Sequence, residues 1–160
     1  MAIVFGSLTN DACSDVQAIA LAAWLATYQD IFDTATIRTF VETYYAVEQL
    51  QSLVASATSG EIYFETVAED GHMLGFCHIG VHDGEGHLFR IYLLPQAQGR
   101  GLGARFLERG ESWLRRQHIV TYGCFVHPAN TSALRFYQRC GFVAQPERDA
   151  GDGVWYVKAL

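Results

Sequence analysis

Apolar residues recur at two different periods along this chain, and the two periods separate helices from strands. Spacings of three and four predict amphipathic helices. Thr9, Asn10 and Asp11 are capping residues that favour a helix start just before the first of these stretches. The helical spacing covers 16–31, Ile37–Tyr44, Val47–Ala57, Leu102–Gln117 and Thr131–Cys140.

Between the third and fourth helical stretches the pattern changes to short runs rich in β-branched and aromatic residues. Two turns separate these runs, Glu69-Asp70-Gly71 and Asp83-Gly84-Glu85-Gly86, and Asp-Gly turns are hairpin signals. The predicted strands are Ala2–Leu8, Ile62–Ala68, Met73–Val81, His87–Leu94 and Val120–Val126, with a final hairpin through Val143 and Val154–Val157.

The length of 160 residues predicts a single domain over residues 1–160, with room for a sizeable core. The wholly apolar run Ala18–Ala26 has nine residues, too few to span a bilayer. It is also not preceded by any Lys or Arg, since the first is Arg38, so it does not fit a signal peptide. We therefore expect a cytoplasmic protein with no membrane partner.

Charge is distributed unevenly. Residues 1–70 hold ten acidic residues and one basic residue, whereas residues 71–160 carry a net charge of +3. Such a division suits an enzyme that takes a cationic amine on one side and an anionic cosubstrate on the other, although solvated faces alone would explain it too. A single lysine and a pI near 5.4 give no basic stripe, so we expect no nucleic-acid partner.

The four cysteines are scattered, with no Cys-x-x-Cys pair, and this is typical of reduced thiols in a chain without an export signal. Cys77 and Cys124 fall in apolar strands, where a cysteine is usually a small core residue. Histidines at 78, 82 and 87 flank a hairpin, but no Cys or carboxylate has ligand spacing beside them. We therefore expect no metal site.

A glycine-rich loop joins the strand ending near Leu94 to the helix beginning near Leu102. It reads Gln98-Gly99-Arg100-Gly101-Leu102-Gly103. Glycines at such a junction let the backbone turn tightly and approach a ligand, and the amides at the helix start favour an anion. The loop therefore predicts a site for a pyrophosphate. It matches neither Gly-x-x-x-x-Gly-Lys-Ser/Thr nor Gly-x-Gly-x-x-Gly.

A second motif follows about 30 residues later, after the strand Val120–Val126. It reads Asn130-Thr-Ser-Ala-Leu-Arg-Phe136-Tyr137-Gln-Arg-Cys-Gly141-Phe142. Gln-x-x-Gly-x-Gly and then Asn-x-x-Ala-x-x-Phe-Tyr-x-x-x-Gly-Phe, in this order, resemble the GNAT superfamily of acetyl-CoA-dependent N-acetyltransferases. The order of predicted elements matches that family along essentially the whole chain.

The resemblance implies an α/β fold of GNAT type. We expect a mixed, mostly antiparallel sheet of six to seven strands with helices on both faces. The N-terminal half, around Trp24–Tyr28, Thr36–Phe40 and Tyr45–Leu50, is weakly similar to bacterial spermidine/spermine N-acetyltransferases.

The resemblance also implies which residues bind acetyl-CoA. Backbone amides from Gly99 to Ala104 would hold the pyrophosphate, and Gln98 opens the motif. The main chain of the preceding strand would pair with the pantetheine arm, as a peptide pairs with a strand edge. The predicted cosubstrate-binding residues are Ile91, Tyr92, Leu93, Gln98, Gly99, Arg100, Gly101, Leu102, Gly103, Ala104 and Asn130. Arg100 is equally well a solvated arginine, and Asn130 is also a candidate helix cap.

Tyr137 matches the family tyrosine beside the CoA sulfur, so the resemblance implies that it returns a proton to the leaving thiolate. The general base is open, because the family's fifth-strand glutamate position holds Phe125 here. A second family position, at the start of the fourth strand, holds His87, which we name as the candidate base; a plain surface histidine is the alternative. Glu85, His127 and Glu65 are further candidates.

The predicted activity is transfer of an acetyl group from acetyl-CoA to a primary amine by direct attack. The acceptor is predicted to be a small cationic amine such as a polyamine. Within the enzyme class, the alternatives are a protein N-terminus or another small-molecule amine. Outside that class, the alternative is a non-catalytic acyl-CoA sensor. A homodimer through an exposed terminal strand is a further possibility.

Overall fold

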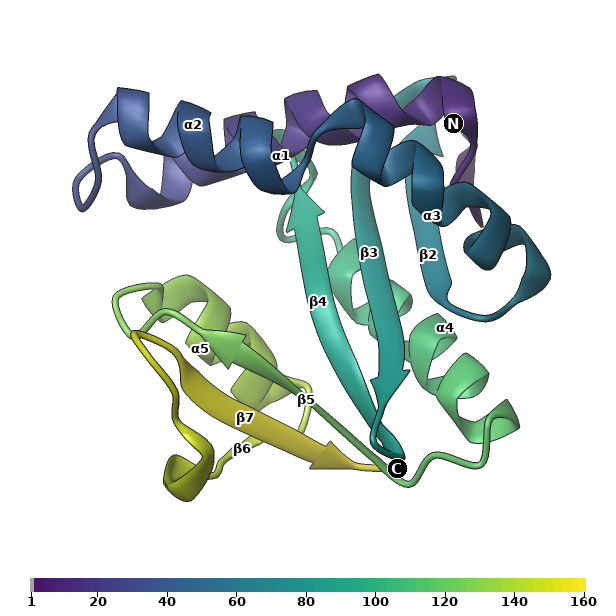
Figure 1. Ribbon diagram of the computed structural model, residues 1–160, viewed down its shortest axis with the longest axis vertical. Helices are drawn as coiled ribbons and strands as arrows, with labels where there is room; N and C mark the ends of the chain where they lie inside the picture. Colours follow the sequence, from purple (N-terminus) through teal and green to yellow (C-terminus); the bar gives the residue numbers. More distant parts are fainter. Residues whose placement is uncertain (1) are drawn as a thin grey trace.

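A computed structural model describes residues 2–160 and contains one sheet of seven strands in the order β1-β2-β3-β4-β5-β7-β6 (Figure 1). Every neighbouring pair is antiparallel except β4 and β5, which run parallel. The strands are β1 Ile3–Ser7, β2 Tyr63–Glu69, β3 His72–His82, β4 Glu85–Leu93, β5 Thr121–Val126, β6 Val143–Ala144 and β7 Val154–Ala159. The predicted mixed, mostly antiparallel sheet is confirmed.

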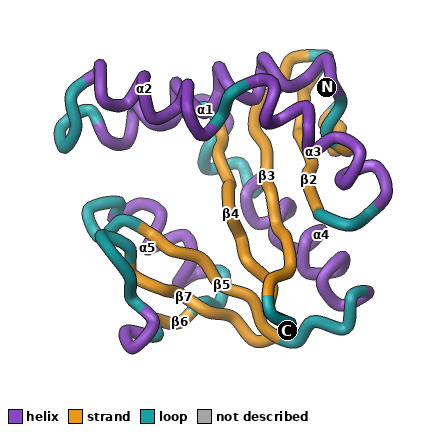
Figure 2. Tube along the Cα trace, in the orientation of Figure 1, coloured by secondary structure: helices purple, strands orange, loops and turns teal. Residues whose placement is uncertain are grey.

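Helices cover both faces of this sheet, as predicted (Figures 1 and 2). They are α1 Cys13–Tyr28, α2 Thr34–Tyr44, α3 Val47–Ser59, α4 Leu102–Arg116 and α5 Thr131–Arg139. The first three pack on one face around Val16, Leu50, Phe64 and Phe76. The last two pack on the opposite face in a second apolar cluster. No helix among residues 2–160 has the length and apolar character needed to cross a membrane.

Both hairpin turns are tighter than the sequence predicted. Glu69 pairs with His72, and His82 pairs with Glu85, so each loop has only two residues. Asp83 and Gly84 have φ angles of 51° and 75°, which the Asp-Gly pair adopts readily in a two-residue hairpin loop. The prediction that Glu85 and Gly86 belong to the turn was therefore wrong, because both already lie in β4.

The parallel strands β4 and β5 pair over only two positions. Gly86 pairs with Tyr122 and His87 with Gly123, and from there the strands diverge toward their carboxyl ends (Figure 1). A register shift between β3 and β4 at His78/Ile79 marks a bulge at Phe89 of β4, two residues after the last position that pairs with β5. The divergence opens a gap in the middle of the sheet and leaves the β5-facing main-chain groups of β4 without a strand partner.

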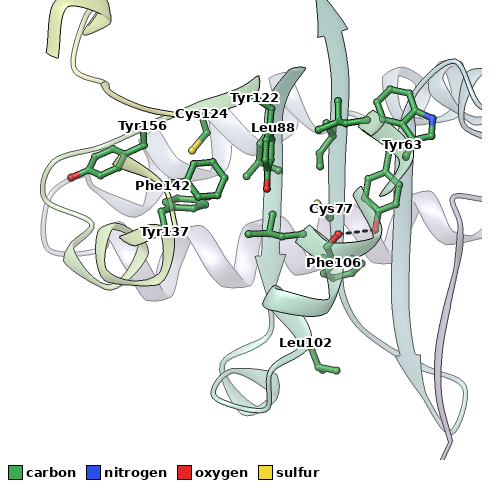
Figure 3. Packing of buried hydrophobic residues seen from close by; sticks show 14 of the residues in the cluster. Tyr63, Cys77, Leu88, Leu102, Phe106, Tyr122, Cys124, Tyr137, Phe142 and Tyr156 are labelled. Atoms are coloured by element: carbon green, nitrogen blue, oxygen red, sulfur yellow. Dashed lines mark hydrogen bonds between the residues drawn. The ribbon is translucent and has the colours of Figure 1, made fainter. Parts of the chain in front are cut away.

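The core beneath α4 and α5 holds the two halves of the divided sheet together. In Figure 3, Tyr137 and Phe142 lie side by side near Cys124, while Tyr63 donates a hydrogen bond of 3.2 Å to the Phe106 carbonyl. A buried carboxylate, Glu111 of α4, accepts hydrogen bonds of 2.6 Å from both the Tyr122 hydroxyl and the Lys158 ammonium. These contacts tie α4 to β5 and β7, so the gap has firm walls.

Candidate active site

The gap between β4 and β5 continues into a cleft of about 800 Å³. Its walls are the carboxyl end of β4, the loop and first turn of α4, the first turn and the inner face of α5, and one side of α1. The two sequence motifs therefore meet at one site, although about 30 residues separate them. The predicted residues that line it are Ile91, Tyr92, Leu93, Gln98, Gly99, Gly101, Leu102, Gly103, Ala104, Asn130 and Tyr137.

The glycine loop takes a backbone conformation that few other residues adopt. Gly99 and Gly101 have φ angles of 74° and 79°, in the left-handed region, and Gly101 is the N-cap of α4. The Gln98 side chain donates a hydrogen bond of 3.3 Å to the Leu93 carbonyl and so ties the loop to the end of β4. The loop is thus held in place from both sides.

This conformation leaves a row of main-chain donors unpaired. Among the described residues, no backbone carbonyl accepts a hydrogen bond from the N–H groups of Gly99 through Ala104. Three of these groups belong to the first turn of α4, where helix geometry provides no acceptor. Because the helix dipole adds partial positive charge at the same point, the loop is suited to an anion such as a pyrophosphate.

Two arginines near the loop have different surroundings. The Arg100 guanidinium forms a bidentate pair with the Glu69 carboxylate, at 2.8 and 3.1 Å, and it is not among the residues that line the cleft. The structure therefore gives no support to a phosphate contact by the Arg100 side chain. In contrast, Arg139 of α5 has the one charged side chain among the described residues that line the cleft. Neither sequence motif singles out Arg139.

Two contacts position α5 against its neighbours, α4 and α1. A Cβ at Gly103 would lie 3.0 Å from the Phe136 ring, so any larger residue there would require the ring to move by a few tenths of an ångström. The Asn130 side chain accepts a hydrogen bond of 3.1 Å from the Ala133 N–H and so caps α5. This confirms the prediction that Asn130 is a helix cap. Its amide also contacts the Tyr28 hydroxyl at 3.4 Å, which links α5 to α1.

The end of β4 supplies one wall of the cleft. Ile91, Tyr92 and Leu93 pair with β3 on one side, and beyond His87 they have no partner in β5. The Tyr92 hydroxyl accepts a hydrogen bond of 3.1 Å from the Trp24 indole, and burial raises the pKa of Tyr92 well above its usual value. This strand edge therefore offers free main-chain groups beside a rigid, uncharged side chain.

Tyr137 lies between the cleft and the core and is 7% exposed. Its ring contacts Phe136 and Phe142, each with a centroid separation of 5.3 Å. Burial raises the pKa of Tyr137 well above its usual value, and the neighbouring Cys124 thiol adds to the shift. At neutral pH the phenol therefore keeps its proton.

His87 lies elsewhere. It belongs to the part of β4 that still pairs with β5, four residues before Ile91, which corresponds to about 13 Å along a strand. Its ring lies beside Phe89 and Trp155, with centroid separations of 5.8 and 5.3 Å, and it is not among the residues lining the cleft. Burial lowers the pKa of His87, and Glu85 opposes the shift. Its role as a base stays a prediction.

The other candidate bases differ in their partners, because two of them are held in ion pairs and one is not. Glu85 is paired with Arg148 at 2.7 Å, and Glu65 with Arg109 at 2.8 Å. His127, in contrast, follows β5 directly and lies three residues before Asn130. Its ring faces Tyr28 of α1 at a centroid separation of 5.7 Å.

A second, smaller pocket of about 170 Å³ lies next to the cleft. It is lined by Trp24, Tyr28, Phe32, Thr36, Ile37, Phe40 and His127, which we call the aromatic pocket. In the sequence, residues 24 and 28 are recognisable only as part of a helical stretch that is weakly similar to bacterial spermidine/spermine N-acetyltransferases. Nothing in the helical spacing distinguishes a ring that closes the core from one that lines a pocket.

The cysteines and the remaining histidines form no further site. Cys13, Cys77, Cys124 and Cys140 are all free thiols. Within residues 2–160, no group of three or more His, Cys, Asp or Glu side chains is placed to hold a metal ion. His78, one of the three hairpin histidines, is buried against Phe64, and burial lowers its pKa to about 3.

Comparison with known proteins places this geometry in a family. The family model described as "Acetyltransferase (GNAT) family" matches residues 21–142. The spermidine N(1)-acetyltransferase of Thermoplasma acidophilum is 24% identical over 159 residues, which cover 99% of this chain and 98% of that protein. The mycothiol acetyltransferase of Acidimicrobium ferrooxidans is 35% identical over 52% of this chain and 29% of its own length.

Solved structures share the fold. The PaiA N-acetyltransferase of Thermoplasma acidophilum, a complex with coenzyme A, has a TM-score of 0.94 and 22% identity, with both chains covered completely. The ribosomal-protein-S18-alanine N-acetyltransferase of Escherichia coli has a TM-score of 0.64 and 20% identity, over 99% of this chain and 93% of that one. At these identities the likeness concerns the fold.

Proposed function

The chain belongs to the GNAT acetyltransferase family, whose members use acetyl-CoA, and from this premise we propose that it transfers an acetyl group to the primary amine of a small cationic molecule such as a polyamine. The family match covers residues 21–142 and so includes both motifs and most of the cleft.

One observation carries the proposal above the others. The N–H groups of Gly99 through Ala104 have no backbone acceptor among the described residues, and all of these residues except Arg100 line the cleft at the N-terminus of α4. Unpaired amides at a helix N-terminus bind phosphate oxygens. Arg139 adds a positive charge to the same cleft, which suits a cosubstrate with several phosphates.

The remaining chemistry follows from the residues beyond the loop. Acetyl-CoA supplies an activated thioester. The free main-chain groups of Ile91 to Leu93 would hold its amide-rich arm as a strand edge holds a peptide. The amine nitrogen attacks the carbonyl carbon, a C–N bond forms and the C–S bond breaks. Tyr137, which keeps its proton at neutral pH, would donate that proton to the departing thiolate.

The amine must lose a proton, because a primary amine with a pKa near ~10.4 is mostly protonated at neutral pH. His87 is our first candidate for this step, acting through water, since it does not line the cleft. His127, beside the aromatic pocket and close in sequence to Asn130, is the second. The effect of His87→Ala and of His127→Ala on the acid limb of the pH–rate profile distinguishes the two.

Two features support a cationic acceptor. Residues 10–59, which include α1, α2 and α3, carry six acidic residues against one basic residue. Of the two curated relatives named above, the spermidine N(1)-acetyltransferase is matched over nearly the full length of both chains, at 24% identity. A negative field on this face would raise the local concentration of a polycation.

One feature favours a second class of acceptor, a small amine that also carries a carboxylate. The half-buried Arg90 guanidinium lies over the Tyr45 ring at 4.8 Å and donates a hydrogen bond of 3.2 Å to the Tyr44 carbonyl. Its other terminal nitrogen, Nη1, is buried without a hydrogen-bond partner among the described residues. A buried donor without a partner is uncommon, and a carboxylate that reached Arg90, which lies outside the lining of the cleft, would satisfy it.

The experiment is a panel of acceptors incubated with acetyl-CoA, read as release of free thiol. The panel contains putrescine, spermidine, n-pentylamine, glycine, alanine and a short peptide with a free N-terminus. The proposal expects turnover with the polyamines above all. Turnover confined to glycine, alanine or the peptide would favour the carboxylate-bearing class. A protein that binds acetyl-CoA but turns over no amine would be a sensor.

A further inference from the structure

The aromatic pocket beside the cleft has features that the transfer reaction itself does not require. Four aromatic side chains, two from α1, one from the connection to α2 and one from α2 itself, surround about 170 Å³. No Lys or Arg is among the residues that line it. Its walls therefore offer the faces of π-systems, which are electronegative.

The rings form a row of neighbouring contacts that runs from Phe40 through Trp24 and Tyr28 to Phe32 and His127. Trp24 lies against Phe40 and Tyr28, with centroid separations of 4.2 and 4.5 Å. Phe32 lies 6.0 Å from Tyr28 and 6.0 Å from the imidazole of His127. Rings that face a common space from several sides bind alkylammonium groups through cation–π attraction.

Acidic residues stand at the edge of this pocket. Asp30 and Asp33 lie in the short connection between α1 and α2, the same connection that carries Phe32. The Asp33 carboxylate accepts a hydrogen bond of 2.7 Å from the N–H of Thr36, which itself lines the pocket. Both carboxylates are exposed, so they add attraction for a cation without an ion pair inside the protein.

The pocket and the cleft share a wall. Trp24 and Tyr28 line the pocket, and each is hydrogen-bonded to a residue that lines the cleft, Tyr92 at 3.1 Å and Asn130 at 3.4 Å. Thr27, between them in sequence, lines the cleft directly. The two spaces are therefore separated by about one aromatic side chain.

We propose that the aromatic pocket binds the distal ammonium group of the acceptor while its reacting amine lies in the cleft. This inference rests on the proposed function, and it assigns the acceptor class to a particular subsite. It predicts that a second positive charge, at a butane-length separation from the reacting amine, improves the substrate. It also predicts that aromatic faces, and not apolar bulk, provide the selectivity.

The first experiment compares two acceptors of equal length, putrescine and n-pentylamine, in which an ammonium replaces a methyl group. Phe32→Leu and Phe40→Leu keep apolar volume and remove the π-face. Phe5→Leu is the matched control, because Phe5 is also a half-buried ring but lies on β1 outside both pockets.

The wild-type protein should prefer putrescine in kcat/KM. Each pocket variant should reduce the putrescine-to-pentylamine ratio by about tenfold, mainly through KM, since a desolvated cation–π contact has that size. Phe5→Leu should leave the ratio unchanged. A wild-type preference for pentylamine, or a ratio that neither pocket variant alters, would overturn the proposal and mark the pocket as merely apolar.

The second experiment needs no turnover, so it separates this inference from the proposed function. Tetramethylammonium, which cannot be acetylated, is titrated into the CoA-bound protein while NMR follows the indole N–H of Trp24, assigned with Trp24→Phe. The resonance should shift in a saturable way in the wild type and in Phe5→Leu but not in Phe40→Leu. An unperturbed wild-type resonance would refute the subsite even if amines are acetylated.

Discussion

Replacement of Gly101 tests the glycine loop most directly, because its strain and its charge effect can be separated. Gly101 has a φ angle of 79°, and a Cβ there would meet no heavy atom within 4 Å. Alanine therefore causes no clash and only strains the backbone. The left-handed region costs an L-residue about 1–2 kcal/mol, and the reduced freedom of the unfolded chain returns part of that, about 0.4–1 kcal/mol.

Gly60 is a matched control. It ends α3 with a φ angle of 83°, and a Cβ there would also meet no heavy atom within 4 Å. Gly101→Ala and Gly60→Ala should therefore lower the free energy of unfolding by a similar amount, about 1 kcal/mol, which is roughly 2–4 °C in Tm for a chain of this size. Only the Gly101 variant should weaken coenzyme A binding. Alanine lets the loop relax from its left-handed conformation, and returning the loop to that conformation costs about 1 kcal/mol, which is about fivefold in affinity.

Gly101→Asp adds a charge to the same position. A carboxylate within ~4 Å of a phosphate repels it by up to about 4 kcal/mol at an effective dielectric of ~20, so coenzyme A affinity should fall by well over tenfold. Calorimetric titration and thermal denaturation of all four variants, Gly60→Asp included, complete the test. A folded Gly101→Asp protein with wild-type affinity, or an equal loss in Gly60→Asp, would refute the loop assignment.

Three further predictions concern the rest of the cleft. Arg139→Gln should weaken coenzyme A binding by about tenfold at low salt and by less at high salt, whereas Arg116→Gln at the far end of α4 should not; equal affinities in a calorimetric titration would remove Arg139 from the site. Tyr137→Phe should lower kcat by about 10²–10⁴-fold with little change in coenzyme A affinity, and an unchanged kcat with chemistry rate-limiting would leave Tyr137 a packing residue. If His87 is the base, activity requires its neutral form, so activity should fall as the pH drops through the His87 pKa; because burial lowers that pKa, the midpoint should lie below the usual histidine value of ~6.5. His87→Ala should abolish this acid limb, and a retained limb that His127→Ala removes would transfer the role to His127.

The sequence by itself determined the order of elements and the conformation of the glycine loop, because both depend on short-range physics. Helical spacing, two Asp-Gly turns and the strand-loop-helix at Gly99–Gly103 all act within a few residues, and each is found in the structure. The Asn130 cap is local in the same sense, since its acceptor and donor lie three residues apart. Even the error at Glu85 concerned only the length of a turn.

Only the tertiary structure decided which side chains meet across elements. Arg100 looked like a phosphate ligand in the loop, but Glu69, 31 residues earlier, holds its guanidinium. His87 matched a family position for the base, yet the point where β4 and β5 diverge leaves it on the paired side and not at the cleft. Arg139 became visible as a cleft residue only when α5 was placed against α4.

The aromatic pocket shows the physical reason most clearly. Its rings come from α1, α2 and the connection between them, and its last wall is His127, about a hundred residues later in the chain. In the sequence, Trp24 and Tyr28 have the spacing of any apolar helix face, because periodicity reports only that a face avoids water. Whether that face is filled by the protein or left open for a ligand depends on how closely α2 and the β5–α5 loop approach it, and that is set by the packing of the whole sheet and its helices.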